Sequence, residues 1–183
     1  MESIDPLMDI KTINNFFEYP DTIRNTALES EYISSPGFGW LGYRCYSITE
    51  NFSETFTDMI HTHISETKNI KKFFCCFHYS LESTKLTAPY DFHEYKIHSD
   101  FCDYAGVVYL TPDPPPNTGT SFYDKSNQIT YSIENKFNRL IYYPAKINHA
   151  PTDLFGDTKE NGRLVLTFFS DMPPNPNIRF LAS

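Results

Sequence analysis

A histidine and an aspartate two positions apart, His98 and Asp100, are the residues of this 183-residue chain best suited to chemistry. Polar and apolar side chains alternate over residues 91–100, which predicts a strand, and side chains two apart on a strand point to the same face. An imidazole nitrogen and a carboxylate oxygen on one face are suitable ligands for a divalent transition metal. The triplet therefore predicts half of a metal site, although His-x-Asp alone is a common pattern.

Two later residues can complete such a site. His149 follows a predicted strand and a tight turn, and Arg163 opens a long apolar stretch after a polar loop. Two imidazoles and one carboxylate on one face of an octahedron leave three positions open, the arrangement used by non-haem Fe(II) oxygenases. The residues and their order therefore indicate a metal centre whose open positions are available for catalysis.

Each of these side chains also has a purely structural interpretation. His149 could be a surface histidine, Arg163 a solvent-facing strand residue and Tyr109 a core aromatic, and for a single residue that role is the more common one. The other histidines have weaker claims. On a predicted helix His61 and His63 face different sides, with His63 at the boundary of the apolar face. His78 and His93 lie on predicted strands, where they could support the site, although filling space is the more common role.

The elements that must position these residues follow from hydrophobic periodicity. Residues 10–17 predict a first strand, and Pro20 starts a helix that buries Ile23, Ala27 and Leu28. A second helix is predicted over 51–66, where apolar side chains recur every three or four residues, with Asn51 and Glu54 as a capping pair.

After the helices the pattern changes to that of strands. Residues 73–79 are apolar on both faces, which predicts an interior strand covered by the second helix. Further strands are predicted over 105–111, 119–123, 139–143, 146–149 and 163–169. Loops are predicted over 34–40, 113–118 and 152–162, a polar segment over 124–137, and a Pro-rich tail from Met172. Two early helices followed by about seven strands indicate an all-β core with flanking helices, a double-stranded β-helix of the jelly-roll or cupin-like type.

Composition sets limits on the class of protein. The 16 Phe, 13 Tyr and 13 Pro indicate a β-rich body with aromatic packing. From the length we expect one domain over 1–183, with N-terminal helical support to about residue 70 and a catalytic core over about 71–171. The net charge of −8 argues against a nucleic-acid partner. The chain has no secretion signal or membrane span, so we expect a soluble, cytoplasmic protein whose four cysteines are reduced core residues.

Over residues 95–171 the sequence resembles the Fe(II)- and 2-oxoglutarate-dependent dioxygenases, most closely their prolyl-hydroxylase-like branch. The segments that carry the resemblance, in the family's order and with its rough spacing, are 98–100, 108–111, 119–122, 138–143 leading to His149, and 163–169. The resemblance implies that His98, Asp100 and His149 bind iron. It also implies that Arg163 pairs with the distal carboxylate of 2-oxoglutarate, assisted by Tyr109.

The chemistry of these side chains suits those roles. A guanidinium presents a planar fork that matches a carboxylate, and a phenol adds a donor without a second charge. Thr167 has the strand parity of Arg163, so its hydroxyl either bonds the cosubstrate or a nearby backbone group. The resemblance implies that O2 and 2-oxoglutarate are converted to succinate and CO2 while a substrate C–H bond is hydroxylated.

Two other functions stay open at the level of sequence. One is a cupin-like metal enzyme that uses no 2-oxoglutarate and needs no arginine at the position of Arg163. The other is a jelly-roll binding module without catalysis. The substrate, either a small molecule or a peptide or protein side chain, is not specified by any motif, because one fold and site can serve many substrates.

Overall fold

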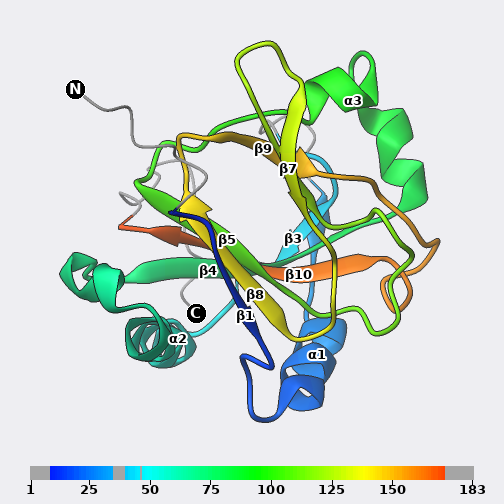
Figure 1. Ribbon diagram of the computed structural model, residues 1–183. Coiled ribbons are helices and arrows are strands. Elements are labelled where there is room, and N and C mark those ends of the chain that lie inside the picture. The colour runs from blue at the N-terminus through cyan, green and yellow to red at the C-terminus, as the bar shows by residue number, and fades with distance from the viewer. Residues whose placement is uncertain (1–8, 35–39, 46, 172–183) are drawn as a thin grey trace, which may run out of the picture.

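Two antiparallel sheets form the body of the protein (Figure 1). The structure, a computed structural model, describes residues 9–34, 40–45 and 47–171. The large sheet has the strand order β1-β8-β5-β10-β4-β3-β2 and the small sheet the order β7-β6-β9. The large sheet contains β1 Lys11–Asn14, β2 Ile33–Ser34, β3 Tyr43–Cys45, β4 Phe73–Ser80, β5 Tyr104–Tyr109, β8 Arg139–Pro144 and β10 Arg163–Ser170. The small sheet contains β6 Thr120–Tyr123, β7 Ile129–Ile133 and β9 Asn148–Pro151.

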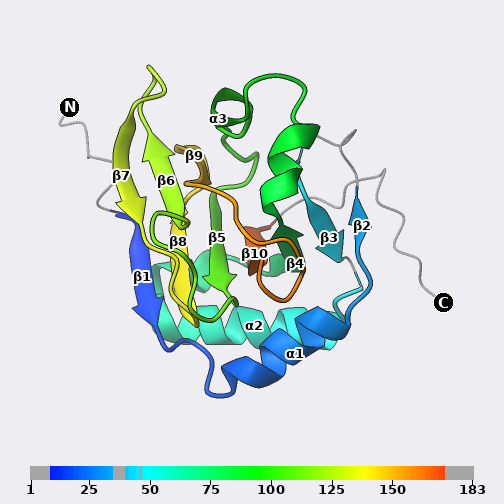
Figure 2. The same ribbon diagram turned by 90° about the vertical axis from the view of Figure 1, so that its right-hand side faces the viewer.

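Helices cover one face of the large sheet. The helices are α1 Pro20–Glu29, α2 Glu50–His63 and the short α3 Phe92–Tyr95, with 3-10 turns at Ser65–Asn69 and Glu82–Thr87. Figure 2 shows α1 and α2 on one side of the molecule and α3 on the opposite side. Buried residues of α1 and α2, including Ala27, Phe56 and Ile60, pack with the large sheet in one apolar cluster. The two N-terminal helices therefore pack against this face of the large sheet.

The second apolar cluster lies between the two sheets. It joins Phe122 of β6 and Ile133 of β7 to Val107, Ile141 and Val165 of the large sheet. Side chains of β10 alternate between the two clusters, because neighbouring residues on a strand face opposite sides. Leu164, Leu166 and Phe168 pack toward the helices, whereas Val165 and Phe169 face the small sheet. The interior-facing half of β10 also carries Arg163, which brings this charged residue between the sheets.

Both long helices begin close to the predicted positions. Pro20 occupies the first turn of α1, where its missing N–H costs nothing. The side chain of Thr49 accepts a hydrogen bond from the Phe52 N–H and caps α2. The prediction that Asn51 and Glu54 form the cap was wrong, because the helix starts before Asn51. It also ends earlier than predicted, and a 3-10 turn replaces its last residues.

The link between β1 and α1 is fastened to β8 by one asparagine. Asn138 has a φ of 58° and is buried, and its side chain bonds both backbone groups of Phe17 at 2.8 Å. Asparagine tolerates this left-handed conformation better than most residues. The two bonds hold Phe17 in the core beneath the large sheet, so the N-terminal support is tied to the strand that precedes His149.

Two predictions about local structure were wrong. Residues 91–100 form no strand: they contain α3, and His98 takes part only in an isolated bridge to His149. The polar segment 124–137 contains β7, whose side chains are mostly exposed. Several boundaries also differ, since β1 covers only part of 10–17, β9 extends to Pro151, and Ile33–Ser34 is a short strand. Residues 35–39 and the tail from Met172 lie outside the described residues.

The chemistry of the core agrees with expectation. All four cysteines, at positions 45, 75, 76 and 102, are buried and free. Burial raises the pKa of the Cys75 thiol to about 12 and that of Cys102 to about 11, so both stay protonated at neutral pH. In the part of the chain that the structure describes, every helix is too short or too polar to cross a bilayer.

Candidate functional site

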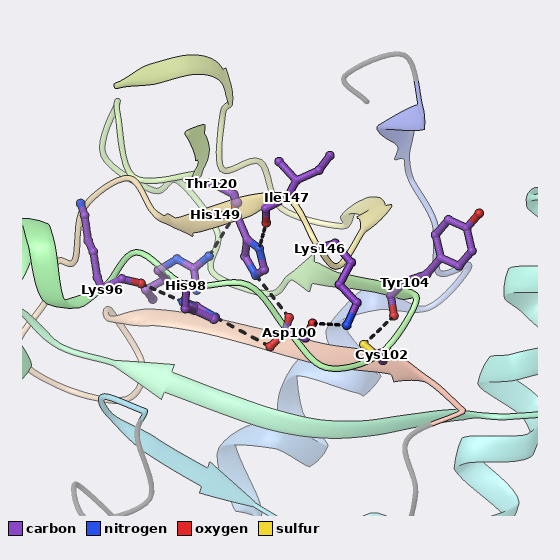
Figure 3. Close-up of polar contacts among 10 residues, drawn as sticks. Lys96, His98, Asp100, Cys102, Tyr104, Thr120, Lys146, Ile147 and His149 are labelled. Atoms are coloured by element: carbon purple, nitrogen blue, oxygen red, sulfur yellow. Dashed lines mark hydrogen bonds and ion pairs between the residues drawn. The ribbon is translucent and has the colours of Figure 1, made fainter. Parts of the chain in front are cut away.

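His98, Asp100 and His149 come together at the edge of the small sheet (Figure 3). One ligand atom of each lies within 4.8 Å of the others. The Nε2 atom of His149 is 3.3 Å from Asp100 Oδ2, and that of His98 is 3.9 Å from Asp100 Oδ1. The predicted convergence of His98 and Asp100 is therefore found, although they do not lie on a strand.

Backbone hydrogen bonds place these side chains. His98 and His149 exchange two N–H to C=O bonds of 3.1 and 2.8 Å, which fixes the segment before β5 against β9. The Asp100 N–H donates to the carbonyl of Ala145, which holds the carboxylate over the turn between β8 and β9. The ring of Tyr143 packs against His149 with 4.7 Å between centroids. A strand is thus unnecessary, because the bridge to β9 sets the direction of His98.

The same ring nitrogen is occupied in both histidines. Nδ1 of His98 bonds the Lys96 carbonyl and Nδ1 of His149 bonds the Ile147 carbonyl, each at 2.8 Å. A carbonyl can only accept, so each Nδ1 carries the proton. The lone pair of a neutral ring is then on Nε2, the atom directed toward Asp100. This orientation by a backbone acceptor is the one commonly found around metal-binding histidines.

A cation fits between these three side chains. In a neutral His149 the Nε2 lone pair would face a carboxylate oxygen 3.3 Å away, and two acceptors at that distance repel unless a proton or a cation lies between them. The donor set of two imidazoles and one carboxylate suits Fe(II) and related divalent metals and leaves positions open. The side-chain geometry is therefore consistent with a catalytic metal centre.

The pKa shifts keep this set in the state that binds metal. Burial raises the pKa of Asp100, but a proton on His149 Nε2 that is hydrogen-bonded to the carboxylate, together with other nearby positive charge, outweighs this effect, so the pKa of Asp100 lies below its usual value. Partial burial, followed by the neighbouring His149, lowers the pKa of His98. At neutral pH an ionised Asp100 and an unprotonated His98 are therefore favoured, as metal binding requires.

Exposure is unequal among the three side chains. The side chain of His149 is 5% exposed and that of Asp100 19%, whereas that of His98 is 52% exposed. The site is thus closed on the side of β9 and open on the side of His98. A ligand can approach the triad from that side.

Arg163 lies deep between the sheets, at the start of β10. It is 4% exposed, its Nη2 atom is 3.5 Å from Thr120 Oγ1, and its guanidinium carbon lies 5.6 Å from the centre of the Tyr109 ring. The Tyr109 hydroxyl bonds Thr120 at 2.8 Å. Among the described residues Arg163 has no ion-pair partner, and its Nε has no hydrogen-bond acceptor. A buried guanidinium without a counter-ion is costly, and a carboxylate ligand would relieve that cost.

One pocket joins the metal triad to Arg163. Its lining includes the triad, Arg163 and Thr167. The Thr167 hydroxyl donates to the Cys76 carbonyl at 3.1 Å, so the backbone partner that the sequence left open is present. Tyr109 lies behind the wall, where it contacts Arg163 and Thr120 and is fully buried.

Several lining residues were not predicted as site residues. They are Arg44, Gly106, Val107, Thr120, Tyr143, Ala150, Pro151 and Phe169. At Gly106 an added Cβ would lie 2.1 Å from the Ile141 carbonyl, so only glycine fits there. Strand parity could have put Thr120 on the face of its strand that carries Phe122, but its position beside Arg163 depends on how the two sheets pack. Arg44 comes from an early three-residue strand that no sequence pattern linked to the site.

The remaining histidines are separate from the triad. His78 lies in the pocket wall, where Nε2 bonds the Leu41 carbonyl at 2.8 Å and burial lowers its pKa well below the usual value. The prediction of a strand at His93 was wrong, because this exposed residue belongs to α3. His61 and His63 lie on α2, where His63 is exposed and contacts Phe16, as expected for a boundary histidine.

Solved structures with the same fold give an independent comparison. A prolyl hydroxylase from Trichoplax adhaerens, in complex with a hypoxia-inducible-factor peptide, superposes with a TM-score of 0.60 at 14% identity over 88% of this chain and 83% of the other. A prolyl-4-hydroxylase from Pseudomonas putida gives 0.54 at 12% identity, over 88% and 91% of the two chains. The chain shares their double-stranded β-helix fold.

This agreement confirms the predicted fold and the resemblance to prolyl hydroxylases at the level of the fold. HygX from Streptomyces hygroscopicus, solved with nickel and 2-oxoglutarate, also matches, with a TM-score of 0.52 at 11% identity over 92% of this chain and 86% of that one. No family model and no curated protein matches the sequence. Identities this low show a common fold, and the activity has to be argued from the site.

Proposed function

We propose that this protein is an Fe(II)- and 2-oxoglutarate-dependent oxygenase that hydroxylates a C–H bond of its substrate. One observation carries the proposal: a single pocket holds a His-Asp-His triad whose ligand atoms lie within 4.8 Å, together with a buried arginine that has no counter-ion among the described residues. The first feature suits a catalytic metal and the second a dicarboxylate. A solved neighbour with this fold was crystallised with nickel and 2-oxoglutarate.

The chain's own residues would divide the work as follows. His98, Asp100 and His149 would hold the metal through Nε2 and carboxylate atoms already directed at one another. Arg163 would bind the far carboxylate of 2-oxoglutarate, with Tyr109 and Thr120 completing its polar environment and Thr167 on the neighbouring wall. The apolar walls between the sheets would exclude water from this end of the pocket. When bound, Fe(II) would supply the site that activates O2 for oxidation of 2-oxoglutarate and substrate.

The balanced reaction consumes 2-oxoglutarate, O2 and a substrate C–H and yields succinate, CO2 and the hydroxylated product. The solved neighbours do not narrow the substrate, since one was crystallised with a peptide and another with hygromycin B. The proposal therefore covers small molecules and peptide or protein side chains. We further propose that residues 1–183 act as one domain, with the N-terminal helices supporting the catalytic core.

Turnover of 2-oxoglutarate tests the proposal. Purified protein with Fe(II), ascorbate and 2-oxoglutarate should release succinate slowly even without substrate, and His149→Ala should abolish this release because it removes the most buried metal ligand. His93→Ala is the matched control, since this exposed histidine lies outside the pocket.

Three distinct outcomes would contradict the proposal. Succinate formation that persists in His149→Ala would remove this residue from the metal site. Metal binding without any 2-oxoglutarate turnover in the wild-type protein would favour the cupin-like alternative, and absence of metal binding would favour a binding module.

A further inference from the structure

A second arginine faces the same pocket from the other side. Arg44 on β3 pairs with His78 on β4, and His78 pairs with Val165 on β10. Residues paired directly across strands point to the same face of a sheet. Arg44 therefore lies on the pocket face of the large sheet, two strands from β10, and lines the pocket with His98 and Asp100.

Among the described residues, the guanidinium of Arg44 makes no hydrogen bond or ion pair. Its guanidinium carbon lies 4.4 Å from the centre of the Trp40 ring, a stacking contact that holds the side chain in place. Its buried Nε has no hydrogen-bond partner, and among the described residues it makes no ion pair. A stacked arginine keeps its planar fork of donors available to a ligand.

Arg44 lies close to the proposed metal-binding residues. Asp100 lines the same pocket. The distance to the carboxylate nevertheless exceeds the 4.0 Å of an ion pair, because the described ion pairs of Asp100 involve only His98 and His149. Arg44 thus lies near the His-Asp-His triad, but its guanidinium makes no ion pair with Asp100.

A count of charges in the pocket leaves one positive charge without a balancing anionic group. With the proposed ligands bound, Fe(II) and Arg163 bring three positive charges, and Asp100 and 2-oxoglutarate bring three negative ones. These groups balance, and the positive charge of Arg44 is left over. A partly enclosed cation of this kind is stabilised by one anionic group, and a doubly charged phosphate would exceed the requirement.

We propose that Arg44 is the residue that binds substrate, and that the substrate carries a carboxylate which pairs with this guanidinium. This inference rests on the proposed function, because the charge count assumes bound metal and 2-oxoglutarate. The two arginines then have separate tasks: buried Arg163 takes the cosubstrate, and half-buried Arg44 takes the substrate on the open side of the triad. The carboxylate anchors the substrate so that a neighbouring C–H group faces the metal ligands.

Binding of acids and amides to the protein loaded with Zn(II) and 2-oxoglutarate tests this inference without turnover. The probes are a panel of N-acetyl amino acids and their matching N-acetyl amino-acid amides, which differ only in the carboxylate. The chain has one tryptophan, and it stacks on Arg44, so selectively excited Trp40 emission reports on this position. We expect the best acid to bind about tenfold or more tightly than its amide, the effect of one charge-assisted pair.

Variants of Arg44 test whether this residue causes the preference for acids over amides. Arg44→Gln should reduce it to about twofold or less, while Arg44→Lys retains part of it as a point charge. Lys71→Gln is the matched control, because it removes one positive charge from an exposed site outside the pocket. Ligand-detected NMR of the same probe pairs provides a readout that does not depend on Trp40 in the variants.

Calorimetry with 2-oxoglutarate separates the two proposals. If 2-oxoglutarate fails to bind the wild-type protein loaded with Zn(II), the proposed function is wrong. If it binds but acids and amides bind equally, if no acid in the panel binds, or if inorganic phosphate binds more tightly than every acid, the assignment of a carboxylate substrate to Arg44 is wrong. Loss of 2-oxoglutarate binding in Arg44→Gln but not in Arg163→Gln would overturn the division of tasks.

Discussion

At the scale of single residues, the proposed metal site depends on which nitrogen of each histidine is free. Backbone carbonyls of Lys96 and Ile147 take the Nδ1 protons, so both Nε2 atoms can bind a cation without rearrangement. Residue types and spacing indicated the ligands, whereas their orientation depends on the bridge between His98 and His149. That bridge joins segments far apart in the sequence, and no local pattern could predict it.

Arg163 is the residue that distinguishes a 2-oxoglutarate enzyme from other metal-binding jelly rolls. Replacement by Gln removes the charge but keeps a planar polar group. We expect the affinity for 2-oxoglutarate to fall roughly 10- to 100-fold, because a charge-assisted hydrogen-bonded pair contributes about 1.5–3 kcal/mol. Isothermal titration of the protein loaded with Zn(II) measures this change, and Zn(II) affinity should stay within about twofold.

Arg139→Gln is the matched control for that experiment. Arg139 bonds Asn14 and the Glu134 carbonyl at the edge of the large sheet and does not line the pocket. Unchanged 2-oxoglutarate affinity in Arg163→Gln would contradict the assignment and favour a cupin-like enzyme without this cosubstrate.

At the scale of elements, the segment between α3 and β5 shows where sequence patterns failed. Polar and apolar residues alternate over 91–100, yet Asp91 caps a short helix by accepting two backbone hydrogen bonds. That local capping competes with strand formation. The strand β7 was also missed, because most of its side chains are exposed and polar and apolar residues do not alternate along it as they do on a half-buried strand. By contrast, β4 and β10 are apolar or alternate clearly, and both were predicted.

Lys96 ties this segment to the chain beyond β9. Its ammonium group donates to the Thr152 carbonyl at 2.6 Å, and its own carbonyl orients His98. Burial is the main cause that lowers the pKa of Lys96 from 10.5 to about 8. Between these two values the unfolded state binds more protons than the folded state. Stability contributed by this residue therefore rises as pH rises through that range, and below about pH 8 the cost of burying the charge is present in full.

Lys96→Met removes that dependence. We expect the free energy of unfolding of the wild type, relative to Lys96→Met, to increase by about 1–2 kcal/mol between pH 7.5 and pH 10, a figure discounted for partial solvent screening. Urea unfolding at both pH values measures the difference. Lys71→Met, which alters an exposed lysine, is the control. A difference between wild type and Lys96→Met that does not vary with pH would contradict the prediction.

At the scale of the whole molecule, the early helices and seven later strands were enough to predict the jelly roll. Helix periodicity defines the face that covers the large sheet, and strand parity divides β10 between the two apolar clusters. The triad and Arg163 were proposed as site residues from their order in the chain, and the fold brings them to one pocket. Arg44 was not, because β3 has only three residues and reaches the pocket through its pairing with β4.

The distribution of charge also becomes clear only in the folded molecule. The chain carries a net charge of −8, yet the pocket contains two arginines and a single carboxylate. Positive charge is thus concentrated where anionic ligands are proposed to bind. Such a site can attract carboxylates from solution even though the protein as a whole is acidic.

The visible absorption of the anaerobic complex tests the central claim, that His98, Asp100, His149 and Arg163 form one site for Fe(II) and 2-oxoglutarate. Adding both to the wild-type protein without O2 should produce a charge-transfer band that neither produces alone. His149→Ala should abolish the band, and Arg163→Gln should shift its appearance to higher 2-oxoglutarate concentration. Absence of the band in the wild type, or its persistence unchanged in His149→Ala, would contradict the account.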